Sequence, residues 1–117
     1  MHADEYAALV AAQMSEDALQ AQVELVADAL GWRHYHTHDS RRSDRGFPDL
    51  VLVRAPRLVF AELKRQNGRV RPDQKLWLGA LQTVAAAVEA ACGQALVEVH
   101  LWRPIDITGN TIAEVLR

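Results

Sequence analysis

The sequence has little cysteine, and it contains no apolar run long enough to form a membrane-spanning helix. Its one cysteine, Cys92, has no second cysteine to pair with, which excludes an internal disulfide. We expect Cys92 to be a buried apolar residue rather than a nucleophile. The first residues include Asp4 and Glu5 and lack the basic start of a signal peptide. A cytoplasmic protein is therefore expected.

Internal repeats and low-complexity tracts are also absent from the sequence, which argues against repeat arrays and flexible linkers. Half of the 117 residues are hydrophobic, which is enough for one buried core. We therefore expect a single domain over residues 1–117.

The small net charge of −2 hides a segregation of charge along the chain. Residues 33–75 contain eleven of the thirteen Lys and Arg residues against five acids, which gives a net charge of +6. The rest of the chain contains two basic residues against ten acids, which gives −8. A basic middle in an acidic surround favours an anionic partner on one surface, although an ordinary solvated face would give the same count.

Apolar spacing and turn residues predict the order helix, three strands, helix, strand and a short closing helix. Ser15 is placed to cap the first helix, with Glu16 and Asp17 in its first turn. Pro72 marks the start of the second helix and Gly93 its end. The helices are expected over residues 16–30, 72–93 and within 106–117, and the strands over 32–37, 49–53, 57–64 and 95–102. This order predicts an α/β fold with a mixed central sheet flanked by helices.

Two of the expected strands form a hairpin, GFPDLVLVRAPRLVFAELKR, whose charged residues gather at one end. If the hairpin turns at Ala55-Pro56, residue i lies opposite residue 111 − i, which brings Asp49 opposite Glu62. Side chains alternate along a strand, so Glu62 and Lys64 share one face. Two carboxylates and an ammonium group are therefore expected at one end of the sheet.

A close pair of carboxylates has a clear chemical use. The two groups repel each other, and a bound cation relieves the cost of ionising both. Oxygen ligands suit a hard ion such as Mg²⁺ or Mn²⁺, which activates water and stabilises charge on a phosphoryl oxygen. Lys64 is placed to orient the attacking water or to neutralise that charge. The simpler alternative is a structural ion pair at a solvated strand end.

These residues resemble the PD-(D/E)xK nuclease superfamily, and more narrowly the VRR-NUC nuclease domain in its small stand-alone form from phages and bacteria. The resemblance covers residues 15–104 and rests on three motifs: G-x-P-D ending at Asp49, E-x-K from Glu62 to Lys64, and Q-x-x-W from Gln74 to Trp77. It implies a restriction-endonuclease-like core, with residues 1–14 as an N-terminal extension, in a bacterial or phage-infected cell. It also implies metal-dependent hydrolysis of DNA, in a family associated with DNA repair, recombination and branched substrates.

The resemblance also implies roles for individual residues. Asp49 and Glu62 would be metal ligands, with the backbone carbonyl of Leu63 as the third. Lys64 matches the catalytic lysine of the family, and Gln74 matches a helix glutamine that faces the active site. Mg²⁺ or Mn²⁺ is the implied cofactor.

The family also tends to have a glutamate on its first helix. At about 100 degrees per residue, the apolar residues of the helix expected over 16–30 form one stripe, with Glu16 at its edge, Gln20 farther out and Glu24 farther still. We therefore expect Glu16 to join the site, Gln20 to support it one turn on, and Glu24 to be solvated. As an alternative, Glu16 is only a first-turn acid that favours the helix dipole.

Basic residues flank the expected site on both sides and are placed to contact phosphates. Such contacts position DNA without reading its sequence. They are Arg41, Arg42 and Arg45 before Asp49, and Arg65, Arg69, Arg71 and Lys75 after Lys64.

Histidine and aromatic residues near the site have several interpretations. His36 and His38 lack the cluster that a zinc site needs, so they are loop or strand-edge residues, DNA contacts or proton shuttles. We expect Trp32 and Tyr35 to lie in the core. For two further tryptophans packing is expected rather than base stacking: Trp77 and Trp102.

The resemblance, together with these residues, implies a structure-selective DNA endonuclease that acts on branched DNA such as a Holliday junction. A domain this small covers little duplex alone, so we expect a symmetric homodimer that presents two sites. One alternative is a DNA-binding or assembly module of the same fold without catalysis, against which the complete set Asp49, Glu62, Lys64 and Gln74 argues. Another is a metal-dependent enzyme for small phosphates or nucleotides, which predicts no affinity for DNA. No membrane partner is expected.

Overall fold

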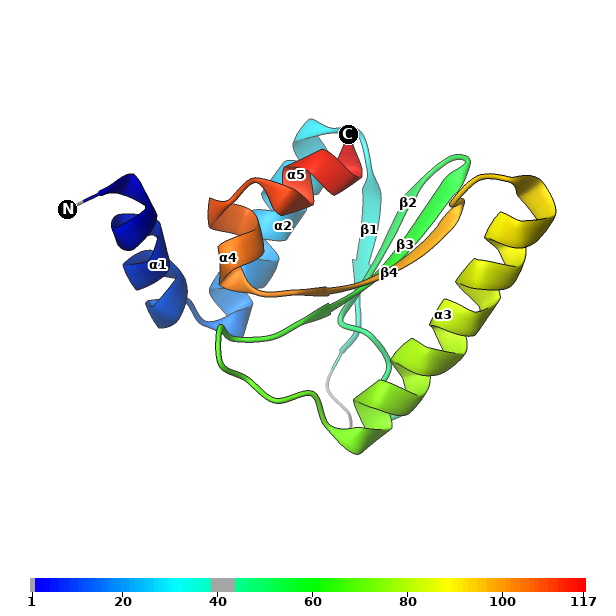
Figure 1. Cartoon of the computed structure of the whole chain (residues 1–117), viewed down its shortest axis with the longest axis horizontal. Helices are drawn as coiled ribbons and strands as arrows, with labels where there is room; N and C mark the ends of the chain where they lie inside the picture. Colours follow the sequence, from blue (N-terminus) through cyan, green and yellow to red (C-terminus); the bar gives the residue numbers. More distant parts are fainter. Residues whose placement is uncertain (1, 39–43) are drawn as a thin grey trace.

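The computed structural model describes residues 2–38 and 44–117, which form a four-stranded sheet with helices on both sides (Figure 1). The α/β fold with a mixed sheet is confirmed, and the predicted N-terminal extension contains a helix of its own. The helices are α1 (Ala3–Gln13), α2 (Glu16–Ala29), α3 (Pro72–Cys92), α4 (Pro104–Thr108) and α5 (Thr111–Leu116). The strands are β1 (Arg33–His36), β2 (Leu50–Arg54), β3 (Arg57–Leu63) and β4 (Val97–Trp102). Across the described ranges, none of the helices combines the length and the apolar character needed to cross a bilayer.

The helix boundaries follow the local signals of the sequence. The Ser15 hydroxyl accepts a hydrogen bond from the amide of Ala18 at 3.1 Å, which caps α2 as expected. Gly93 ends α3 with a φ of 73°, a left-handed conformation that glycine adopts without steric cost. Cys92, expected to be buried, is exposed. It lies in the last turn of α3, whose buried residues are near the start of the helix.

The strands lie in the order β1-β2-β3-β4, and only β3 and β4 are parallel. Within the hairpin, Leu50 pairs with Ala61 and Arg54 with Arg57, so the predicted register is confirmed. One step beyond the first of these pairs lie Asp49 and Glu62. The hairpin therefore brings the two acids to the same end of the sheet.

The hydrophobic core lies on the face of the sheet that α2 and α5 cover (Figure 1). Alternate residues of β2 and β3 point into it, because side chains alternate along a strand. A fully buried Leu or Val side chain contributes roughly 1.5–3 kcal/mol. The core side chains are Leu19, Val23, Ala27, Trp32, Leu50, Leu52, Val59, Ala61, Leu63, Trp102, Ile112 and Leu116.

The opposite face of the sheet is covered less completely. Helix α3 packs along β4, at one edge of the sheet, whereas β1 forms the other edge. Tyr35 on β1 is therefore 57% exposed, and its expected place in the core is wrong. Trp32, which precedes the same strand, is buried as expected.

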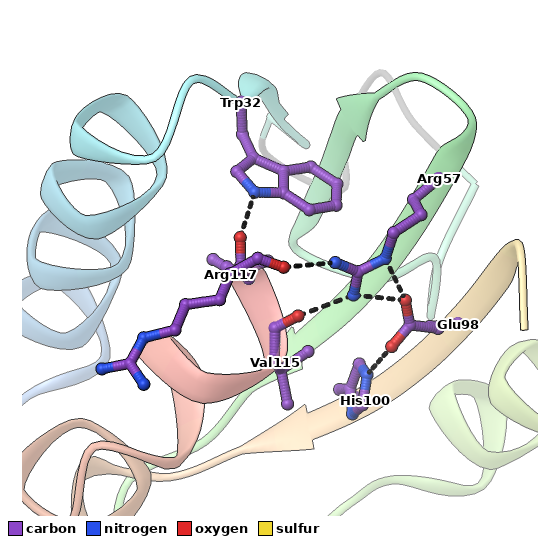
Figure 2. Close-up of polar contacts among 7 residues, drawn as sticks. Trp32, Arg57, Glu98, His100, Val115 and Arg117 are labelled. Atoms are coloured by element: carbon purple, nitrogen blue, oxygen red, sulfur yellow. Dashed lines mark hydrogen bonds and ion pairs between the residues drawn. The ribbon is translucent and has the colours of Figure 1, made fainter.

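A polar cluster holds the residues around Val115 against the sheet (Figure 2). The Arg57 guanidinium donates to the Glu98 carboxylate at 2.6 and 2.8 Å and to the carbonyl of Val115 at 2.6 Å. The Trp32 indole donates to the carbonyl of Leu116 at 2.7 Å, and the guanidinium lies 5.0 Å from its ring. Arg57, counted in the basic middle of the sequence, thus has a structural role on the core face.

Candidate active site

Asp49 is held at the end of the hairpin by backbone contacts on two sides. The Thr37 amide donates to the Asp49 carbonyl at 2.8 Å, and the Thr37 hydroxyl donates to the Pro48 carbonyl at 2.6 Å. On the side of β3, Oδ2 of Asp49 accepts a hydrogen bond from the amide of Leu63 at 2.8 Å. The carboxylate therefore has a fixed place beside the E-x-K segment.

Glu62 is the most unusual acid among the described residues, because its side chain is only 1% exposed. Its Oε1 accepts a hydrogen bond from Nε2 of Gln74 at 3.1 Å, whereas Oε2 is buried without a hydrogen-bond partner in the described part of the chain. Burial and the neighbouring Asp49 carboxyl raise the pKa of Glu62 to about 9, and Lys64 opposes this rise. A buried acid with an unpaired oxygen is costly unless a cation or a proton compensates it.

Gln74 reaches Glu62 from the first turn of α3, and its orientation is fixed by the helix cap. Its Oε1 accepts a hydrogen bond from the amide of Arg71 at 2.9 Å. The side-chain oxygen is thereby engaged, so the amide nitrogen is the end that faces Glu62. The side chain of Gln74 thus faces the site, as the sequence predicts, and contacts Glu62.

Gly46 lets the loop before Asp49 lie directly against the start of α3. Its φ is +91°, and a Cβ added there would lie 2.5 Å from the carbonyl oxygen of Asp73. Only glycine fits this position without displacing backbone. The close approach couples the loop that carries Asp49 to the helix that carries Gln74.

A cavity of about 320 Å³ opens over these groups. It brings together the predicted residues Asp49, Glu62, Lys64, Gln74, Glu16, Arg45, Arg71 and His38. Lys64 is only 7% exposed, although it lines the cavity. Four residues to which the sequence analysis gave no role in the site complete the wall, including the glycine of the G-x-P-D motif: Thr37, Asp44, Gly46 and Phe47.

Helix α2 places two of the predicted residues, Glu16 and Gln20, at cavities beside Asp49. Glu16 lines the cavity, and its charge adds to the rise in the pKa of Glu62. Gln20 lines an adjoining cavity of about 210 Å³ together with Glu16, Asp49 and Leu63, but its amide donates to Glu24 at 3.3 Å. Glu24, expected to be solvated, is half-buried and pairs with His34 at 3.1 Å.

Other predicted residues lie outside the main cavity or outside the described part of the chain. Arg41 and Arg42 belong to the latter group. His36 does not line the cavity, although its ring lies 4.5 Å from that of His38. Three basic residues are exposed on the surface without lining the cavity: Arg65, Arg69 and Lys75.

Metal binding at this site would use two carboxylates and a backbone oxygen. Across residues 2–38 and 44–117, no three His, Cys, Asp or Glu side chains are grouped to hold a metal ion. The N–H and C=O of one strand residue point to the same side. Because the Leu63 amide donates to Asp49, the Leu63 carbonyl faces the same side of β3. The pairing of β2 with β3 ends at Leu50 and Ala61, so no residue of β2 is paired with Leu63 there. With the unpaired Oε2 of Glu62, this oxygen set fits a hard divalent ion.

Comparisons with known proteins identify the family and the fold. The family model of the VRR-NUC domain matches residues 4–95. A solved structure described as a VRR_NUC domain is 21% identical in sequence and superimposes with a TM-score of 0.57. The match covers 83% of this chain and 92% of that one, which indicates a shared fold. No curated protein matches the sequence.

Proposed function

Because the chain belongs to the VRR-NUC domain family, a family of nuclease-type domains, we propose that it is a Mg²⁺- or Mn²⁺-dependent endonuclease that hydrolyses DNA phosphodiester bonds. One observation supports this most strongly. The buried Oε2 of Glu62 has no hydrogen-bond partner in the described chain, and it lies beside Asp49 in a cavity also lined by Lys64. Such an arrangement favours a cation next to a phosphate.

Three oxygen groups would hold the metal: the carboxylates of Asp49 and Glu62 and the carbonyl of Leu63. When bound, a divalent ion supplies positive charge for a phosphoryl oxygen and lowers the pKa of water. The Leu63 amide and the Gln74 amide each fix one carboxylate through a hydrogen bond. These contacts set the ligand oxygens in place before substrate arrives.

Lys64 and Glu16 would act on the reacting groups themselves. Lys64 shares the face of β3 with Glu62 and is largely withdrawn from water, so its positive charge is weakly screened. It would orient the attacking water or stabilise negative charge as it develops on the phosphate. Glu16, across the cavity on α2, would accept a proton or hold a water molecule.

DNA would approach over the basic residues at the rim of the cavity. Arg45 and Arg71 line it, and their side chains are 72% and 49% exposed. Each lies near the Asp73 carboxylate, at 3.9 and 3.2 Å, which positions both at the start of α3. Further phosphates would be contacted by the remaining basic residues: Arg41, Arg42, Arg65, Arg69 and Lys75. His36 and His38 would lie beside this path.

We further propose that the substrate is branched DNA, such as a Holliday junction, and that the protein acts as a homodimer. The domain is small, with principal extents of 48 × 33 × 22 Å, so one copy covers only part of a junction. A twofold dimer would present two cavities to two strands.

Cleavage of synthetic DNA tests the proposal. Flaps, forks, four-way junctions and linear duplexes are incubated with the protein in Mg²⁺, Mn²⁺ or EDTA. Metal-dependent cutting is expected, with a loss of about 100-fold or more in Asp49→Asn and Lys64→Met. Asp4→Asn, a change of the same chemistry at an exposed site on α1, serves as the control.

Two alternatives predict different results in the same assay. A DNA-binding module without catalysis would bind the junction but would not cut it in the presence of either Mg²⁺ or Mn²⁺. An enzyme for small phosphates would release phosphate from nucleotides and would not bind DNA at low salt.

A further inference from the structure

Another cavity, of about 260 Å³, adjoins the proposed catalytic cavity on the side of Phe47. It is lined by Tyr35, Thr37, Asp44, Phe47 and Trp77. Three of these residues, Thr37, Asp44 and Phe47, also line the catalytic cavity. The two cavities therefore share a wall. Two neighbouring parts of one ligand, such as a phosphate and the adjacent nucleotide, could occupy both cavities at once.

Three of the five residues that line this aromatic cavity have aromatic rings: Tyr35, Phe47 and Trp77. The Phe47 ring lies 5.1 Å from the Trp77 ring and 6.1 Å from the Phe60 ring, edge to face in both cases. Phe47 therefore links helix α3 to the sheet. Tyr35, on the edge strand β1, also lines the cavity and is 57% exposed.

The aromatic wall begins next to both proposed metal ligands. Phe47 precedes Asp49 by two residues, and Phe60 precedes Glu62 by two residues on the same face of β3. Two residues along a strand span about 7 Å. Phe60 thus lies about one such step from Glu62 and contacts Phe47 of the aromatic cavity, while the catalytic cavity itself is lined mainly by charged and polar side chains.

We propose that the aromatic cavity binds one unpaired nucleobase adjacent to the phosphate that is cleaved. The inference rests on the proposed nuclease function. A phosphate held beside Asp49 and Arg45 would place the neighbouring nucleotide within reach of the shared wall, where aromatic side chains line the second side. Every base has a π-face, so stacking there binds any base.

This subsite would make the enzyme selective for DNA structure rather than for sequence. A base in a continuous duplex has to leave its stack and its partner before it can enter, which opposes binding. A base at a branch point, flap or single-stranded end has already left them. The cavity would therefore favour cleavage next to unpaired nucleotides.

The alternative occupant of this face is a second copy of the chain. Tyr35 and the incompletely covered sheet around it would then pack against apolar side chains of a partner. Two measurements on the same variants distinguish a nucleobase from a second copy. One is the difference in cleavage between intact and abasic DNA, and the other is self-association of the protein.

The experiment uses an oligonucleotide substrate with a mapped cleavage position in an unpaired region. An abasic site replaces each unpaired nucleotide flanking that position in turn. For the wild-type protein, kcat/KM should fall roughly tenfold at one position, which is within the range that base–aromatic stacking supplies. Tyr35→Ala should cut the intact and the abasic substrate equally, and Tyr35→Phe, which keeps the ring, should restore the difference.

Tyr6→Ala is the matched control, because Tyr6 is a similarly exposed tyrosine (64%) on α1. It should discriminate between the two substrates as the wild type does. Trp77→Leu, which keeps bulk but loses the aromatic face, should also lose the discrimination. Equal cutting of intact and abasic DNA by the wild type would overturn the inference and leave the nuclease proposal standing.

Binding without cleavage covers the case in which the protein does not cut. A 2-aminopurine base is placed at the unpaired position, and its fluorescence is followed in Ca²⁺. Quenching in the wild type and Tyr35→Phe, but not in Tyr35→Ala, supports the subsite independently of activity. Unchanged fluorescence, or a Tyr35→Ala variant that alters only sedimentation of the protein, assigns the face to another use and overturns the inference.

Discussion

The side-chain amide of Gln74 donates a hydrogen bond to Oε1 of Glu62 at 3.1 Å, across the boundary between α3 and the sheet. The partner oxygen of the same carboxylate, Oε2, is buried and unpaired within the described chain. One oxygen is thus fixed by Gln74, whereas no donor in the described chain fixes the other. This division is what a metal ligand with an orienting neighbour requires.

Removal of that donor should weaken metal binding more than folding. In Gln74→Ala the Glu62 carboxylate loses its fixed orientation, and we expect Mn²⁺ affinity to fall about 10- to 100-fold. Isothermal titration calorimetry measures the change. Gln82→Ala, at an exposed position on the same helix, is the control and should bind Mn²⁺ as the wild type does. Equal affinities in the two variants would show that Gln74 does not orient the ligand.

The raised pKa of Glu62 predicts how stability depends on pH without metal. Between the ordinary value of 4.5 and about 9, the unfolded chain carries an ionised Glu62 while the folded protein keeps it protonated. The folded state binds more protons in this window, so the free energy of unfolding falls as pH rises through it, by about 1 kcal/mol per pH unit. Below pH 4.5 both states are protonated, so the contribution of Glu62 to stability is fully present and no longer changes with pH.

Urea unfolding in EDTA at several pH values measures this slope. Glu62→Gln, which stays neutral at every pH, should remove most of it. A slope that is the same in the wild type and in Glu62→Gln would assign the pH dependence to other groups.

The same pKa predicts that metal binding releases a proton. At pH 7 the metal-free site holds a proton on Glu62, and a divalent ion needs the ionised carboxylate as its ligand. Mg²⁺ or Mn²⁺ affinity should therefore rise as pH increases toward 9. Calorimetry in buffers of different ionisation enthalpy should report about one proton released per ion. A heat of binding that is independent of the buffer would contradict this.

Gly46 and Gly79 offer a matched pair of glycine substitutions. Gly46→Ala introduces a Cβ 2.5 Å from the Asp73 carbonyl at a φ of +91°, so we expect a loss of about 1–3 kcal/mol in unfolding free energy. Gly79→Ala in α3 meets no atom within 4 Å and should be neutral or stabilising by about 0.5–1 kcal/mol. Chemical denaturation compares the two. Gly46→Ala should also lower activity, because its loop carries Asp49.

Much of the site could be predicted from the sequence because it depends on local geometry. The two-residue turn at Ala55-Pro56 fixes the hairpin register, and the register places Asp49 beside Glu62. Helical spacing placed Glu16 at the edge of the buried stripe, and this side chain lines the cavity. The position of the turn, the alternation of side chains along a strand and the helical repeat were enough to predict where these three side chains lie.

Other features depend on contacts between distant segments, which periodicity does not reveal. Tyr35 alternates with polar residues as a core strand would, yet α3 packs over β4 and leaves β1 exposed. Gln20 lines the smaller cavity beside Asp49, but its side-chain amide donates to Glu24, one turn away on the same helix. Arg57 counts as a basic surface residue in the sequence, whereas Glu98 and the carbonyl of Val115 hold it against the core face.

The most direct test is the anomalous scattering of a crystal soaked in Mn²⁺. We predict a peak within bonding distance of the carboxylates of Asp49 and Glu62, and no peak at this place in crystals of Asp49→Asn. A fully loaded wild-type crystal with its Mn²⁺ bound elsewhere, and with Oε2 of Glu62 still unpaired, would contradict the assignment of these two acids as the metal site.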